Sequence, residues 1–281
     1  MTSAIEAIHR RVSVRSYADR SVEQGKKQEI ATLINSTEEG PFGNKVRFHL
    51  IDLSEMERNE IRSLGTYGFI SGAKLFIVSA VKDGAGAMVD LGYCFEKVIL
   101  AATNLDLGTC WLGGTFKRAN FAKRINLSDG EIVVAISPIG YARDKRSIRE
   151  IAVRRFAGSD QRKPWGELFF DGDMNTPLSL NSSGAYAVPL ECVRRGPSAS
   201  NNQPWRIMYD KVGQAFHFCL KRTWAYDKFN GGMDLQLVDM GIAMCHFELS
   251  AREKGLNGTW EVRKPALTNG GAEYIVTWKG S

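Results

Sequence analysis

Two arginines and a serine alternate in the segment RVSVRSY, at Arg11, Ser13 and Arg15. Residues two apart in an extended segment point to the same side, so these three side chains would share one face. A guanidinium gives bidentate, charge-assisted hydrogen bonds to phosphate, and a hydroxyl adds one more donor. The spacing therefore predicts a site for a small anion such as a phosphate group.

Two other stretches are suited to holding a ligand. GPSASNNQPWR, residues 196–206, carries many hydrogen-bonding groups, and Pro197 and Pro204 exclude a regular helix or a central strand there. GTCWLGGTF, residues 108–116, contains glycines that let the backbone approach a flat ligand closely. Both are expected to be irregular segments that contact a bound molecule.

A third group of cations follows a strand-like segment, in GYARDKRSIRE, with Lys145, Arg146 and Arg149. The net charge of the chain is +6, but its lysines and arginines are spread out, with no block of five or six. This pattern argues against a nucleic-acid partner. It favours a solvated basic surface with a few cations reserved for a small anion.

The elements that must position these residues occur twice. The segment VDLGYCFEKVILAATNLDLGTCW from Val89 aligns without a gap with VDMGIAMCHFELSAREKGLNGTW from Val238, at an offset of 238 − 89 = 149 residues. Each has apolar residues at helical spacing and ends in a Leu-plus-Gly turn, which predicts a helix in each half.

Two further pairs of segments are rich in β-branched and aromatic residues and predict strands: NKVRFHLIDL with QPWRIMYDK, and EIVVAISPIGY with EYIVTWKG. The chain is therefore expected to have an α+β fold made of two tandem copies, residues 1–175 and 176–281, joined by a connector rich in Gly, Asn, Asp and Ser. Two copies in one polypeptide predict an intramolecular pseudo-dimer, a monomer that acts as a fused dimer.

The two copies carry different chemistry. The first has the alternating arginines, the glycine-rich segment and the basic segment, whereas the second has the polar loop. At the place of that loop the first copy has GPFGNKVRF, and in place of RVSVRSY the second has YAVPLECVRRG. A symmetric homodimer must keep every motif in one sequence, but a fused dimer can lose half of each set. One complete site per chain is therefore expected.

The segments RVSVRSY, LDLGTCWLGG and GPSASNNQPWR resemble the motifs of the FMN-dependent nitroreductase family, in the family order and over most of the chain. The two-copy arrangement resembles its fused TM-nitroreductase branch. The resemblance implies that FMN lies between the copies. Carried over by motif, the first copy would supply Arg11, Ser13, Arg15, Lys145, Arg146 and the backbone of Leu112, Gly113 and Gly114, and the second copy Pro197, Ser198, Asn201 and Gln203. Which of Lys145 and Arg146 would meet the phosphate stays open.

The resemblance implies a flavoprotein oxidoreductase that takes electrons from NAD(P)H and passes them to a nitroaromatic, a quinone or a similar small acceptor by a ping-pong mechanism. The flavin would carry the chemistry, so no catalytic acid or base is expected. Three alternatives stand beside this reading: reductive dehalogenation, a non-enzymatic flavin-binding protein for storage or sensing, and a relic with both sites degraded.

Other patterns have plainer interpretations. Gly84 and Gly86 imitate a dinucleotide-binding fingerprint, but Val89 stands where the third glycine belongs. His217 and Cys219, two apart on an expected strand, indicate packing rather than a metal site, and no metal is expected. Trp165 is expected to dock its segment, with Leu168 and Phe169, on the other copy.

The five cysteines are odd in number and have no CxxC spacing, which indicates reduced thiols, several of them buried. The first residues lack the apolar core of a signal peptide, and no apolar stretch approaches the length of a membrane span. A cytoplasmic protein with no membrane partner is expected.

Overall fold

The computed structural model describes most of the chain: residues 3–36, 39–56, 65–66, 68–144, 161–223, 233–263 and 270–281. Lys145 and Arg146, which the resemblance assigns to a phosphate site, lie outside the described residues, as does Arg149.

The first sheet contains β1 (Val46–Asp52), β2 (Leu75–Lys82), β3 (Gly108–Thr109) and β4 (Glu131–Gly140), in the order β1-β2-β4-β3. All of its neighbouring strands are antiparallel. The strands predicted for the first half are therefore confirmed. Because β2 is antiparallel to both of its neighbours, the Gly84–Gly86 turn after it is not part of a parallel dinucleotide-binding unit.

The second sheet contains β5 (Phe169–Asp171), β6 (Trp205–Asp210), β7 (Ala215–Leu220), β8 (Gly258–Glu261) and β9 (Glu273–Gly280), in the order β5-β6-β7-β9-β8. Apart from β5, which runs parallel to β6, its strands are antiparallel and follow the same order as those of the first sheet. The strand β5 falls within the expected first unit, residues 1–175, yet it pairs in the second sheet.

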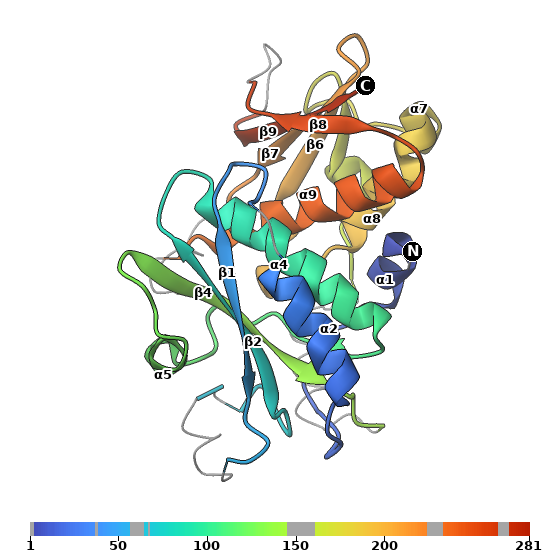
Figure 1. The fold of residues 1–281 in the computed structure, drawn as a ribbon. Coiled ribbons are helices and arrows are strands. Elements are labelled where there is room, and N and C mark those ends of the chain that lie inside the picture. Colours follow the sequence, from blue (N-terminus) through green and yellow to red (C-terminus); the bar gives the residue numbers. More distant parts are fainter. Residues whose placement is uncertain are drawn as a thin grey trace.

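Helix α4 (Ala87–Asn104) lies against the first sheet and helix α9 (Leu235–Glu253) against the second, and the two helices pack on each other between the sheets (Figure 1). Both helices were predicted from the repeated segment. They cross at its glycines: a Cβ on Gly92 would lie 2.1 Å from the carbonyl oxygen of Val238, and one on Gly241 would lie 2.0 Å from that of Val89. Only residues without a side chain permit so close an approach.

The remaining helical elements are shorter and lie around this pair: α1 (Ala4–Arg10), α2 (Gln24–Asn35), α5 (Arg118–Arg124), α7 (Leu180–Ser183), α8 (Ala187–Arg195) and the 3₁₀ turns η1 (Trp165–Glu167), η2 (Gly184–Tyr186) and η3 (Ala199–Asn201). Helix α1 crosses to the other half, where it packs on α9 (Figure 1). There the carboxylate of Glu253 accepts hydrogen bonds from Ser3 Oγ at 2.6 Å and from the backbone N–H of Ala4 at 2.7 Å.

One cluster of buried apolar side chains includes residues of both sheets and of both central helices, so the two halves share a core. None of the five cysteines forms a disulfide and all are buried, which confirms the prediction of buried, reduced thiols. Burial raises the pKa of Cys94 to about 12 and that of Cys192 to about 11, which keeps both thiols protonated. None of the described helices has both the length and the apolarity that crossing a membrane requires.

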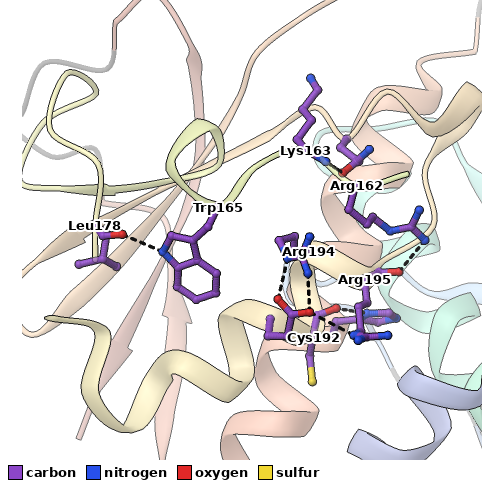
Figure 2. Close-up of polar contacts among 10 residues, drawn as sticks. Arg162, Lys163, Trp165, Leu178, Cys192, Arg194 and Arg195 are labelled. Carbon is purple, nitrogen blue, oxygen red and sulfur yellow. Dashed lines mark hydrogen bonds and ion pairs between the residues drawn. The ribbon is translucent and has the colours of Figure 1, made fainter. Parts of the chain in front are cut away.

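The segment around Trp165 docks on the second sheet, as predicted. Its indole Nε1 donates to the carbonyl of Leu178 at 2.7 Å (Figure 2), and its ring meets that of Phe169 edge-on, with centroids 4.5 Å apart. Leu168 and Phe169 are fully buried. This docking brings the preceding residues, 161–163, against the polar loop.

Candidate functional site

A cavity of about 400 Å³ lies between the two halves. Nine of the twelve residues that the motifs single out contribute to its wall: Arg11, Ser13, Arg15, Leu112, Gly113, Gly114, Pro197, Ser198 and Asn201. The first six come from the first half of the chain and the last three from the second. Segments about 180 residues apart in sequence therefore meet around one volume (Asn201 and Arg15, 201 − 15 = 186).

The arginine segment is extended and fixed on both edges. The N–H of Val14 donates to the carbonyl of Thr109 at 2.8 Å, and the carbonyl of Arg15 accepts from Ser71 N–H at 2.8 Å. This backbone pairing turns the side chains of Arg11, Ser13 and Arg15 to the cavity, as their alternation predicts. Among the described residues, Nη1 of Arg15 is buried without a hydrogen-bond partner, so this guanidinium retains capacity to bind an anion.

Behind Arg11 lies a buried polar network that crosses the halves. Oε1 of Glu96 on α4 is 3.9 Å from Nε of Arg11 and 2.9 Å from Nε2 of His246 on α9, and its Oε2 accepts from Trp111 Nε1 at 2.7 Å. Nδ1 of His246 is 2.8 Å from the carbonyl of Cys192, which can only accept, so Nδ1 carries a proton. The network fixes Arg11 and Trp111, both of which line the cavity.

The glycine-rich segment forms another part of the wall. The backbone N–H and C=O of Leu112 are both paired with Ile136 at 3.0 Å, so Leu112 offers the cavity only its side chain. The guanidinium of Arg118 donates to the carbonyl of Gly113, so this carbonyl is already paired within the chain. A Cβ on Gly113 would lie 2.7 Å from Cδ1 of Leu235, so a larger residue would collide with α9.

The polar loop is held in an unusual backbone conformation. Ser200, Asn201 and Gln203 have φ values of 49°, 56° and 47°, in the left-handed region that non-glycine residues seldom occupy. The loop is closed by hydrogen bonds from Gln203 N–H to Ser198 Oγ at 2.9 Å and from Asn201 N–H to the carbonyl of Ser198 at 2.9 Å. Backbone strain of this kind concentrates at functional sites.

Gln203 does not line the cavity. Its side chain is 3% exposed, its Oε1 accepts from the N–H of Lys163 at 2.8 Å (Figure 2), and its Nε2 donates to the carbonyl of Asn201 at 3.1 Å. Asn201 lines the cavity, but its Nδ2 donates to the carbonyl of Gln161 at 2.9 Å. Both amides therefore hold the loop to residues 161–163.

Sequence reasoning missed Arg162, a third guanidinium in the cavity wall. Its Nη2 donates to the carbonyl of Arg195 at 3.1 Å (Figure 2), and its Nη1 lies 3.3 Å from Oδ1 of Asn201. The available signal was the basic pair Arg162-Lys163 directly before the docking segment of Trp165.

Sequence reasoning also missed Asp239, the acid of the repeated Val-Asp-x-Gly motif, which lines the cavity from α9. It is 3% exposed, and its Oδ1 accepts from the N–H of Ala199 in the polar loop at 2.9 Å. Its Oδ2 is buried and has no hydrogen-bond partner among the described residues. Burial raises the pKa of Asp239 well above its ordinary value, and the charge of Asp234 acts in the same direction.

Comparisons with known proteins agree with this architecture. A family model described as "Putative TM nitroreductase" matches residues 3–251 of the chain. The crystal structure of a "putative nitroreductase" from Thermotoga maritima aligns with a TM-score of 0.62 at 21% sequence identity, covering 99% of this chain and 94% of that one. An FMN-dependent nitroreductase from Clostridium difficile aligns with a TM-score of 0.42 at 19% identity, covering 51% of this chain and 90% of its own. No curated protein matches the chain. The fold, with its mixed helices and sheets, is nitroreductase-like.

Proposed function

The chain belongs to the TM nitroreductase family, and on that premise we propose that it is a flavin-dependent oxidoreductase that holds one FMN in the cavity between its halves. One observation carries the proposal. The motif residues of the two halves, Arg11 to Arg15 on one side and Pro197 to Asn201 on the other, line the same cavity although nothing in their sequence separation requires it.

The residues present fit FMN in size and in charge. A volume of about 400 Å³ lies in the range of small-molecule and cofactor sites, roughly 300–1,000 Å³. The wall contains three guanidiniums, those of Arg11, Arg15 and Arg162, and Nη1 of Arg15 lacks a partner among the described residues. A phosphate group satisfies such donors with charge-assisted hydrogen bonds. Gly113 and Gly114 place backbone without side chains in the cavity wall.

We assign the phosphate to Arg11, Ser13 and Arg15, assisted by Lys145 or Arg146, and the ring and ribityl chain to Leu112, Gly113, Gly114, Pro197, Ser198 and Asn201. Bound FMN supplies the electron-transfer chemistry, and the chain orients it and excludes water. We propose NAD(P)H as the electron donor and a small nitroaromatic, quinone or similar molecule as the acceptor. Donor and acceptor use the same site in turn, which predicts ping-pong kinetics.

We also propose that the two halves form a pseudo-dimer within one chain. This is supported by the equal strand orders β1-β2-β4-β3 and β6-β7-β9-β8, and by the equivalent helices α4 and α9 at their contact. In this arrangement the second, symmetry-related site lacks both the arginine segment and the polar loop. One FMN per chain follows from that loss.

The test is to release flavin by denaturation and to quantify it against protein. A ratio near one is expected, with the absorption bands of FMN in the native protein, and a ratio near two contradicts the loss of the second site. Anaerobic addition of NADH or NADPH is expected to bleach those bands. A protein that binds FMN but is reduced by neither donor is a storage or sensing protein, and one that binds no FMN is a relic.

A further inference from the structure

Asp90 and Asp239 occupy equivalent positions in the two central helices, at the repeat offset of 239 − 90 = 149 residues. Each carboxyl group holds a loop of its own half. Asp90 holds residues 42–44, and Asp239 holds the polar loop at Ala199. The two acids can therefore be compared directly, because each anchors a loop of its own half to a central helix.

The carboxyl group of Asp90 is fully used. Its Oδ1 accepts from the N–H of Phe42 at 2.8 Å, and its Oδ2 accepts from the N–H of Asn44 at 2.8 Å and from its Nδ2 at 2.9 Å. Asp90 is completely buried but does not line the cavity. Burial raises the pKa of Asp90, but the three N–H donors act in the opposite direction, and anchoring the loop accounts for both of its oxygens.

Only one oxygen of the Asp239 carboxyl group accepts a hydrogen bond from a described residue. One N–H donor, from Ala199, reaches Oδ1, whereas Oδ2 has no partner in the described part of the chain. Its neighbours on the cavity wall are the apolar side chains of Leu235, Val238 and Ile242. A buried carboxylate with one donor and no counter-ion is costly, and proteins avoid that cost by keeping the group neutral.

Among the described residues, no cation pairs with Asp239. Asp234 on the same helix is an acid, and the cations of the cavity, Arg11, Arg15 and Arg162, form no ion pair with Asp239 within the part of the chain that the structure describes. A neutral carboxyl group has one O–H donor. Since Oδ1 already accepts from Ala199, the proton belongs on Oδ2, the oxygen that has no partner among the described residues.

We propose that Asp239 is a protonated carboxylic acid whose Oδ2–H donates a hydrogen bond to an acceptor atom on the ring of bound FMN. The inference rests on the proposed function, because it needs flavin in the cavity. The flavin ring presents carbonyl oxygens and imine-type nitrogens that accept hydrogen bonds. An acid kept neutral by an apolar site is suited to donate to such an acceptor, and a carboxylate is not.

The decisive measurement is infrared difference spectroscopy of the full-length protein, in the C=O stretch region of protonated carboxylic acids, before and after FMN is added to the flavin-free form. We expect a band that is absent in Asp239→Asn, retained in Asp90→Asn, and shifted when FMN binds. A purely structural acid gives a band that FMN does not move. An ionised Asp239 gives no such band. Either result overturns the proposal.

FMN affinity gives a second readout. Asn keeps an acceptor for Ala199 and a donor at Nδ2, so Asp239→Asn is expected to bind FMN within about threefold of the parent, and Asp239→Ala about tenfold more weakly. A tenfold loss in Asp239→Asn overturns the proposal, since it indicates a carboxylate that accepts. If the parent binds no FMN, the proposed function falls and the inference with it. If the parent binds FMN but the frequency of the band does not change on binding, only the inference about Asp239 is contradicted.

Discussion

The loop at residues 40–44 and the polar loop at residues 197–203 are anchored by equivalent acids, but they differ in how completely their polar groups are satisfied. In the first loop the carboxylate of Asp90 accepts three hydrogen bonds, and the only positive φ belongs to a glycine, Gly43 at 85°. In the second, one oxygen of Asp239 has no described partner, and three non-glycine residues have positive φ. The relaxed loop lies away from the cavity and the strained loop lines it. Strain and unused hydrogen bonds are retained where we propose that a ligand supplies the missing contacts.

The largest expected effect concerns the crossing of α4 and α9, where the two halves are most alike. Gly92→Ala and Gly241→Ala each force a methyl group to within about 2 Å of a backbone carbonyl of the opposite helix, at 2.1 Å and 2.0 Å. Each should lower the free energy of unfolding by about 3 kcal/mol or more, since neither backbone can move without separating the sheets. Urea denaturation measures both, and Gly25→Ala, where a methyl group has open space, is the control. A large effect at only one of the two would show that the contact is not symmetric.

The next effect separates the arginines of the two halves. Arg15→Ala should weaken FMN binding by about 2 kcal/mol, roughly thirtyfold in Kd, because a charge-assisted bond to the phosphate is lost. Arg194→Ala is the matched control, since Arg194 belongs to the segment that replaces RVSVRSY in the second half and is paired with Glu191 at 2.6 Å (Figure 2). Calorimetric titration with FMN and with riboflavin is the measurement. Equal losses for both ligands would make Arg15 structural.

An effect of similar size, on the free energy of unfolding, separates the two acids. Asp90→Asn turns an N–H donor toward Phe42 or Asn44, whose own N–H groups also donate, and should cost about 2 kcal/mol of unfolding free energy. Asp239→Asn keeps the bond from Ala199 and should cost nothing. Thermal unfolding of both variants beside the parent makes the comparison. Equal losses would mean that Asp239 is as fully used as Asp90.

The smallest effect is the pH dependence of that difference. Burial holds the pKa of Asp239 above its unfolded value, so the folded protein binds more protons than the unfolded chain between the two pKa values. The contribution of Asp239 to the stability of the parent should therefore fall as pH rises through that interval, while Asp239→Asn lacks this contribution. The stability difference between variant and parent, measured from acid to neutral pH, should grow in favour of the variant. A difference that is constant with pH would show that Asp239 has an ordinary pKa.

The sequence predicts the repeated elements well because their signal is local. The helix from Val89 and its copy from Val238 follow from apolar spacing and a closing glycine turn, and the alternation of Arg11, Ser13 and Arg15 needs only an extended backbone. Contacts that depend on tertiary packing could not be predicted from the sequence. Arg162 reaches the cavity only because Trp165 docks its segment on the second sheet.

Gln203 shows the opposite case, a residue placed correctly in the loop whose side chain then serves another purpose. Its amide is taken by Lys163 and Asn201, neither of which its motif reveals. Asp239 was visible as part of a repeat, but a repeat suggests equal roles. Only the count of hydrogen bonds on each carboxyl group separates it from Asp90.

The crossing of α4 and α9 at Gly92 and Gly241 has a consequence for ligand size. Helix α9 carries one side of the cavity, through Leu235, Val238, Asp239 and Ile242, and the chain that leads away from α4 carries the other. Their separation is set by backbone touching backbone, so repacking core side chains cannot tune it by small steps. The distance between these two walls of the cavity is therefore fixed. A change in the bulk of the accepted molecule must then come from the loops at the rim, such as the one at Phe69, which is 37% exposed at the mouth of the cavity. Selection for new acceptors would therefore change residues in those loops and leave Gly92 and Gly241 unchanged.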